Sequence, residues 1–183
     1  MNIVLTKAEG EVPMPSLLNR ETGAVHPGER TMCAEHFQMA YVTNNPDQAC
    51  TLLTRQLGIR AFSALDGINA EGGRMDVRFA WRGTLMYEII HASGPGSAIF
   101  MHQIEGLPDF ALHHHHLGFL VQDRAHWESV LDDAQKNGCE IPWKSSNTLV
   151  DACFVKRPGF PHLFEYLLPT VAGLAFFNNV PRS

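Results

Sequence analysis

At residues 37–45 the chain reads FQMAYVTNN, and at residues 115–123 it reads HHLGFLVQD. These two segments align with each other, and MYEII at 86–90 aligns in the same way with LFEYL at 163–167, at an offset of 77 to 78 residues. Similarity at a fixed offset indicates an internal repeat. We therefore expect two copies of one structural unit.

Each copy carries one candidate metal ligand in its first strand-like segment and one in its last. These are Gln38 and Glu88 in the first copy and His116 and Glu165 in the second. An unpaired carboxylate inside an apolar strand costs roughly several kcal/mol, so these side chains either face solvent on a one-sided sheet or are neutralised. Two carboxylates, an imidazole and an amide oxygen suit Zn²⁺, Ni²⁺, Co²⁺, Mn²⁺ or Fe²⁺. We expect the four residues to ligate one divalent metal ion.

The composition is that of an ordinary globular protein, and it argues against nucleic acid and membranes as partners. The 183 residues are 45% hydrophobic and 18% charged, with a net charge of −5 and no run of Lys or Arg. Neither nucleic acid nor a membrane surface is therefore expected as a partner. The apolar runs are too short for a membrane helix and no signal peptide is evident, so a cytoplasmic location is expected. The four cysteines form no CxxC pair and are expected to be free and mostly buried.

Local signals predict the order βαβββ in each copy. In the first copy, Asn45 caps a helix that ends at Gly58, with Asp66-Gly67 as a turn. In the second copy, Asp123 caps a helix that ends at Gly138. The predicted strands are 37–43, 59–65, 75–82 and 84–91, then 114–121, 139–144, 149–156 and 162–168.

This order divides the chain into five parts. We expect an N-terminal arm at 1–33, a first βαβββ module at 34–93, a connector with a short helix at 94–112, a second module at 113–168 and a C-terminal tail at 169–183. The arm would wrap the domain or a partner subunit. The tail would pack on the sheet or across a dimer.

The histidine run His113-His114-His115-His116 lies at the start of a predicted strand. Because residues two apart in a strand share a face, His114 and His116 are predicted to point one way and His113 and His115 the other. At most two of the four then serve one site. We expect His116 to be a ligand and His113 and His115 to lie at a solvated strand end.

The repeat, its two first-strand motifs and the strand-borne glutamates resemble the vicinal oxygen chelate superfamily, the glyoxalase/bleomycin-resistance/extradiol-dioxygenase group, over residues 36–168. The resemblance implies an α+β fold in which two βαβββ modules in tandem form a cupped mixed sheet around a metal. One ligand comes from the first and one from the last strand of each module. By position these are Gln38, Glu88, His116 and Glu165, a set similar to that of one class of glyoxalase I.

One departure from that class concerns the turn before the last ligand strand. Glyoxalase I proteins usually carry a D-P-x-G turn there, whereas this chain reads KRPGFPH at residues 156–162. The segment 86–91 is closer to the glyoxalase-like and epimerase-like branch. Glutathione thiohemiacetal is therefore not assigned as the substrate.

The four candidate ligands are sufficient for one type of reaction, a metal-assisted proton transfer. A divalent ion that binds two adjacent substrate oxygens would stabilise an enediolate, while a carboxylate moves a proton between neighbouring carbons. Glu165 is the expected base and Glu88 the second choice. Candidates for orienting the substrate are His91, His102, His114 and Tyr41. The substrate is expected to be apolar or aromatic if the cup is lined by several of Phe79, Trp81, Met86, Phe100, Met101, Phe110, Trp143, Phe154 and Phe160.

The sequence thus predicts a metal-dependent lyase or isomerase that acts on a small oxygenated molecule, in a homodimer. One alternative is an Fe²⁺ extradiol-type dioxygenase, which would need two histidines and one carboxylate, from His116, Glu165 and a further histidine such as His114. The other is a metal-free protein that binds a drug or metabolite. Metal analysis and oxygen consumption distinguish the three.

Overall fold

A computed structural model describes residues 17, 18 and 34–183, and within them all the strands belong to one eight-stranded mixed sheet. The strand order is β2-β3-β4-β1-β5-β8-β7-β6. The elements are β1 (Glu35–Thr43), α1 (Pro46–Leu57), β2 (Ser63–Ile68), β3 (Arg74–Arg82), β4 (Leu85–Ser93), α2 (Ala98–Met101), β5 (Leu112–Leu120), α3 (Arg124–Lys136), β6 (Glu140–Ser146), β7 (Val150–Lys156), β8 (Leu163–Pro169) and α4 (Val171–Asn179). None of the described helices is long and apolar enough to cross a membrane.

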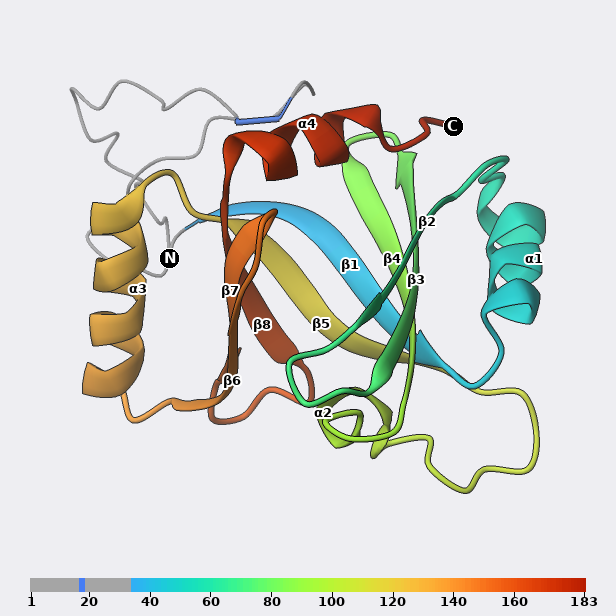
Figure 1. Cartoon of the computed structure of the whole chain (residues 1–183), viewed down its shortest axis with the longest axis horizontal. Helices are drawn as coiled ribbons and strands as arrows, with labels where there is room; N and C mark the ends of the chain where they lie inside the picture. Colours follow the sequence, from blue (N-terminus) through green and yellow to red (C-terminus); the bar gives the residue numbers. More distant parts are fainter. Residues whose placement is uncertain (1–16, 19–33) are drawn as a thin grey trace, which may run out of the picture.

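The two copies meet at the centre of the sheet. In each copy the first and last strands pair in parallel, β1 with β4 and β5 with β8. The antiparallel pair β1 and β5 then joins the copies. The sheet curls so that β2 and β6, its two edges, approach each other across an open cup (Figure 1). This confirms the predicted α+β fold of tandem βαβββ modules. The exact domain boundaries stay a prediction.

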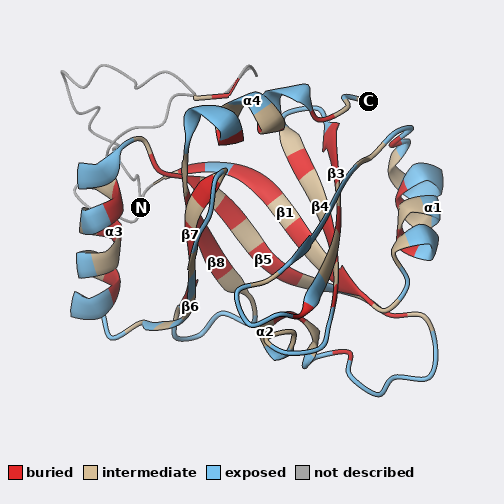
Figure 2. Cartoon of the chain, in the orientation of Figure 1, coloured by how far each residue is buried: buried red, intermediate tan, exposed pale blue. Residues whose placement is uncertain are grey.

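Both faces of the sheet carry buried apolar side chains, because successive side chains along a strand point to opposite faces. On the outer face, α1 packs on Ala80 and Ile89, and α3 packs on residues of β7 and β8 that include Tyr166. The inner face forms a third cluster within the cup, with Phe79 and Phe154 among its members. Figure 2 shows the buried residues concentrated on the central strands. The inner-face residues of those strands therefore set the floor of the cup.

The predicted helix caps are confirmed. The side chains of Asn45 and Asp123 accept hydrogen bonds from the backbone N–H of Gln48 and His126, at 3.0 and 2.8 Å. Capping of this kind satisfies a backbone donor that has no partner inside the helix. Gly58 adopts φ +71°, which favours glycine.

The turn predicted at Asp66-Gly67 is wrong, and the strand predicted at 59–65 begins too early. Both residues lie inside β2, and the chain instead turns around Asn69, whose side-chain oxygen accepts hydrogen bonds from the N–H groups of Glu71 and Gly73. Ile59 is buried under α1 instead of lying in the strand. The Asn69 side chain thus stabilises a turn three residues further along.

The C-terminal tail packs on the sheet of its own chain. The indole N–H of Trp81 donates a buried hydrogen bond of 2.9 Å to the carbonyl of Phe177, and the Phe177 ring lies edge-on to that of Phe37, 5.6 Å between centroids. In Figure 1, α4 crosses one end of the cup. The predicted arm lies outside the described residues apart from Leu17 and Leu18, of which Leu18 is buried in the inner core.

Gly173 allows α4 to approach Leu149, the residue before β7, closely, and this contact generates a first prediction. A Cβ atom at position 173 would lie 2.1 Å from the carbonyl oxygen of Leu149. Gly173→Ala is therefore expected to lower the free energy of unfolding by about 1–3 kcal/mol, the usual cost of overpacking. Urea unfolding measures this loss, with exposed Ala175→Ser as a control expected to stay within about 0.5 kcal/mol of wild type. Equal stability of Gly173→Ala and wild type would contradict the close approach of α4.

Candidate metal centre

The four predicted site residues come from four adjacent strands at the centre of the sheet. Gln38 lies in β1, Glu88 in β4, His116 in β5 and Glu165 in β8. All four side chains line one cavity of about 530 Å³ on the inner face of the cup. Residues far apart in sequence meet here because each copy contributes its first and last strands to the middle of the sheet.

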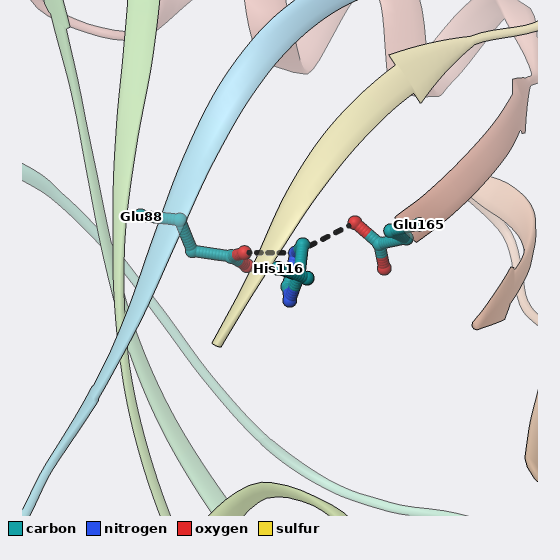
Figure 3. Close-up of side chains that lie close together, drawn as sticks. All are labelled: Glu88, His116 and Glu165. Carbon is teal, nitrogen blue, oxygen red and sulfur yellow. Dashed lines mark ion pairs between the residues drawn. The ribbon is translucent and has the colours of Figure 1, made fainter. Parts of the chain in front are cut away.

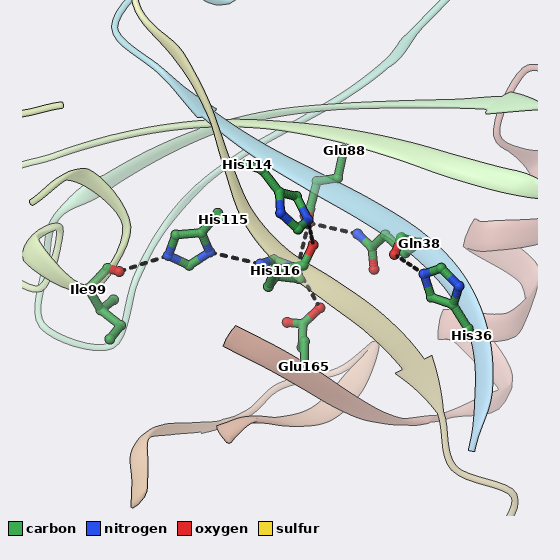
Figure 4. Close-up of polar contacts among 8 residues, drawn as sticks. All are labelled: His36, Gln38, Glu88, Ile99, His114, His115, His116 and Glu165. Atoms are coloured by element: carbon green, nitrogen blue, oxygen red, sulfur yellow. Dashed lines mark hydrogen bonds and ion pairs between the residues drawn. The ribbon is translucent and has the colours of Figure 1, made fainter. Parts of the chain in front are cut away.

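Three of these side chains form a compact group. Nε2 of His116 lies 3.1 Å from Oε2 of Glu165 and 3.3 Å from Oε2 of Glu88 (Figure 3). One ligand atom from each residue lies within 4.8 Å of the other two, and no other such group of three occurs among the described residues. The amide nitrogen of Gln38 donates a hydrogen bond of 2.7 Å to Oε2 of Glu88 (Figure 4). The geometry therefore brings all four predicted residues together.

Burial and mutual charge shift the protonation of this group. Desolvation raises the pKa of Glu88, with a further upward contribution from the charge of Glu165, and the neighbouring His116 opposes both. Burial alone would lower the pKa of His116, but the carboxylates of Glu165 and Glu88 outweigh it and raise that pKa to about 9. A positive charge at this point thus offsets two buried negative charges. A divalent cation would meet the same electrostatic demand and would replace the proton on Nε2.

Two buried atoms support the fit of a metal ion to these residues. Oε1 of Gln38 has no hydrogen-bond partner among the described residues, and Nε2 of His116, although close to both carboxylates, makes no hydrogen bond of good geometry. Buried polar atoms are normally paired. An amide oxygen, an imidazole nitrogen and two carboxylates are suitable donors for a divalent cation. The set fits the metal that the sequence predicts, and the role of each residue as a ligand remains a proposal.

Comparison with known proteins agrees with this architecture. The model of the Glyoxalase/Bleomycin resistance protein/Dioxygenase superfamily matches residues 35–144. The chain belongs to this superfamily. No curated protein matches the chain in sequence.

Solved structures with the same fold include methylmalonyl-CoA epimerases. The enzyme from Mycobacterium tuberculosis is 13% identical, with a TM-score of 0.55 over 81% of this chain and 95% of that one. A Streptomyces coelicolor variant in complex with 2-nitronate-propionyl-CoA is 13% identical, with a TM-score of 0.52 over 74% and 96%. A hypothetical protein from Bacillus halodurans is 12% identical, with a TM-score of 0.55 over 74% and 94%. At these identities the likeness establishes the fold alone.

The prediction that the side chains of the histidine run alternate between the two faces of the sheet is wrong. The strand register passes from Ala40 opposite His116 to Tyr41 opposite His114, so His115 is the extra residue of a β-bulge. A bulge interrupts the alternation of faces. His115 is therefore buried beside His116, with 2.8 Å between their Nδ1 atoms, instead of lying at a solvated strand end. His113 is exposed, as expected.

His114 is turned away from the site by the same bulge. Its ring packs against those of Tyr41 and His162, and it does not line the cavity. His91, His102 and Tyr41 are likewise absent from the cavity lining. These four therefore do not contact a substrate held in the described cavity. His114 also cannot supply the second histidine that the dioxygenase alternative requires.

Gly118 lies between the two halves of the site and generates a second prediction. It is opposite Gln38 on one side and Glu165 on the other, and a Cβ atom there would lie 2.6 Å from Oε1 of Gln38. Gly118→Ala is expected to displace the Gln38 amide and to weaken divalent-metal binding about 10-fold or more, because misplaced metal-site groups typically cost 10- to 100-fold in affinity. Competition with a chromophoric chelator measures the change. The exposed His113→Ala variant serves as the control. If Gly118→Ala binds the metal with wild-type affinity, the position of the Gln38 amide does not matter for metal binding.

Proposed function

We propose that this protein is a divalent-metal-dependent isomerase or lyase that moves a proton between neighbouring carbons of a small substrate with two adjacent oxygens. The observation that carries the proposal is the buried group of Glu88, His116 and Glu165 at the floor of the cup. Two carboxylates and an imidazole at the floor of one cavity provide both a cation-binding set and a base.

The residues proposed to hold the metal are Gln38 through Oε1, His116 through Nε2, and the carboxylates of Glu88 and Glu165. When bound, the ion would act as a Lewis acid that stabilises negative charge on two neighbouring substrate oxygens. The protein residues hold the substrate in the cup, exclude water and transfer the proton.

Glu165 is the residue proposed to take and return the proton. Glu88 has two close neighbours, since it accepts a hydrogen bond from Gln38 and lies beside His116. For Glu165 the close polar neighbour is His116. A carboxylate with fewer fixed partners reorients more readily toward a substrate carbon. Glu165 would remove a proton from the hydroxyl-bearing carbon next to a carbonyl and return it to the former carbonyl carbon. The hydroxyl proton passes to the former carbonyl oxygen, so the carbonyl group moves to the neighbouring carbon. Inversion of the first carbon would instead need a second group on the opposite face, such as Glu88, to deliver the proton.

The walls of the cavity favour a substrate with an apolar or aromatic part. Three of the aromatic residues considered from the sequence line it, namely Phe79, Phe100 and Trp143. Of the charged side chains lining the cavity, those outside the central group are Asp66, Glu71 and Lys144. A single lysine against two carboxylates in this part of the described chain offers little attraction to a multiply phosphorylated substrate. We therefore propose a compact, weakly charged substrate.

Metal analysis combined with solvent-deuterium exchange tests this function. The untagged protein is expected to contain one divalent ion per chain, and the metal-loaded protein to exchange the proton next to the carbonyl of an aryl- or alkyl-substituted α-hydroxyketone into D₂O, as followed by NMR. Removal of the ion with a chelator should abolish the exchange. Metal-free protein that still binds these compounds would favour the ligand-binding alternative, and oxygen consumption with catechols would favour the dioxygenase. Size-exclusion chromatography with light scattering tests the proposed homodimer.

Replacement of Glu165 separates the base from the ligands and provides a third prediction. Glu165→Gln keeps an oxygen donor and nearly the same volume but removes the negative charge and most of the basicity. We expect deuterium exchange to slow by about 10²-fold or more, since general-base effects are typically worth 10²- to 10⁴-fold, while the variant retains most of its metal. Glu88→Gln is the matched comparison and should be milder. A fully active Glu165→Gln with an inactive Glu88→Gln would reverse the two roles.

A further inference from the structure

The two copies of the repeat contain equivalent β-bulges. In the first copy the register passes from His36 opposite Phe119 to Gln38 opposite Gly118, so Phe37 is the extra residue. In the second copy His115 is the extra residue, immediately before His116. Both extra residues are buried beside the inner core, as Phe37 and His115 are 0% and 1% exposed. An apolar ring therefore satisfies the packing at this position, and the imidazole at 115 requires another explanation.

Both ring nitrogens of His115 have partners. Nε2 lies 2.9 Å from the carbonyl oxygen of Ile99 in α2, and Nδ1 lies 2.8 Å from Nδ1 of His116 (Figure 4). The ring packs against Phe100 and Phe154, with centroid distances of 5.5 and 5.3 Å. His115 is thus held in one orientation between the connector helix and a proposed metal ligand.

The chemistry of these partners determines the direction of both hydrogen bonds. A carbonyl oxygen only accepts, so Nε2 of His115 carries a proton and donates to Ile99. The two Nδ1 atoms share one further proton. If His115 held it, this imidazole would be a cation with no carboxylate among its contacts, whereas a proton on His116 belongs to the ring that faces Glu88 and Glu165. His116 is therefore the donor and His115 the acceptor.

We propose that His115 is a positioning residue that holds His116 in the form protonated at Nδ1, which leaves the Nε2 lone pair for a divalent cation. The inference rests on the proposed function where it names a divalent cation as the bound ion. The direction of the hydrogen bond between the two histidines is independent of that proposal. Metal-binding histidines generally donate their second ring N–H to a fixed acceptor, which orients the ring and increases ligand basicity. Here the acceptor is the neighbouring histidine, which the bulge turns to the inner face of the sheet.

The connection to α2 gives the site a link to the connector between the two modules. The carbonyl of Ile99 orients His115, and His115 orients His116. A shift of α2 would therefore reach the cation site through two hydrogen bonds. The first module has no such connection at the equivalent position, because Phe37 carries no polar side-chain atom.

Two-bond ¹H–¹⁵N NMR spectra of the histidine rings test the hydrogen-bond direction directly. In metal-free full-length protein we expect His115 to carry a proton on Nε2 only, and His116 to carry the shared proton on Nδ1 in addition to the Nε2 proton between the two carboxylates. After addition of Zn²⁺, Nε2 of His116 should shift as a metal-bound nitrogen, with the Nδ1 proton retained. A proton on Nδ1 of His115, or Zn²⁺ bound through Nδ1 of His116, would overturn the proposal.

Two variants at position 115 distinguish positioning from packing. His115→Phe copies the residue at the equivalent bulge and keeps the ring while removing both nitrogens, and it is expected to weaken Zn²⁺ binding about 10- to 100-fold. His115→Asn retains an acceptor near the Nδ1 position and should recover part of that loss. Exposed His113→Asn is the matched control and should bind Zn²⁺ like wild type.

The outcomes separate this inference from the proposed function. Wild-type Zn²⁺ affinity in His115→Phe, or equal losses in His115→Phe and His115→Asn, would overturn the positioning role. Thermal unfolding of both variants identifies any loss that comes from a disturbed fold, and the NMR spectra of the wild type decide the hydrogen-bond direction even if His115→Phe fails to fold. A wild-type protein that binds no divalent ion would contradict the proposed function, while its metal-free spectra would still show whether Nδ1 of His115 or Nδ1 of His116 carries the shared proton.

Discussion

The burial of two carboxylates beside one imidazole is the interaction on which this structure depends. Glu88 and Glu165 would repel each other and lose hydration in the floor of the cup, yet His116 lies 3.3 and 3.1 Å from them. Positive charge between the carboxylates is required, because isolated buried charges are strongly unfavourable. The same requirement that makes the site costly to fold makes it suitable for a divalent cation and for proton transfer.

The symmetry of the repeat places these groups, and the bulges adjust them. Parallel pairing of the first and last strands in each copy brings four polar residues from distant parts of the chain to one floor. Each bulge then turns the residue before Gln38 or His116 into the inner face. One copy uses that position for a core phenylalanine and the other for a histidine that contacts the site. Divergence at one equivalent position thus gives the two halves different chemistry within one scaffold.

Much of the fold followed from local signals, and the failures have local causes. Asn45 and Asp123 are predictable caps because a short polar side chain just before an apolar helical pattern can accept a hydrogen bond from a free backbone N–H of the first turn. The predicted strand 59–65 ends too early because Asp66-Gly67 resembles a turn, while the side-chain hydrogen bonds of Asn69 stabilise the actual one. Strand alternation places His115 on the wrong face because it assumes an uninterrupted register. No residue in a run of four histidines marks which one is extra.

By itself the sequence determined the repeat, the α+β class and the four polar positions, since these depend on residue type and spacing along the chain. The superfamily match agrees with the predicted family. Only the tertiary structure decided that His115 joins His116, that His114 faces outward, that Gly118 leaves room for the Gln38 amide and that the tail covers one end of the cup. Each of these depends on the pairing of strands that are distant in sequence. A shift of one residue in that pairing reverses the face on which a side chain lies, so no local pattern contains the answer.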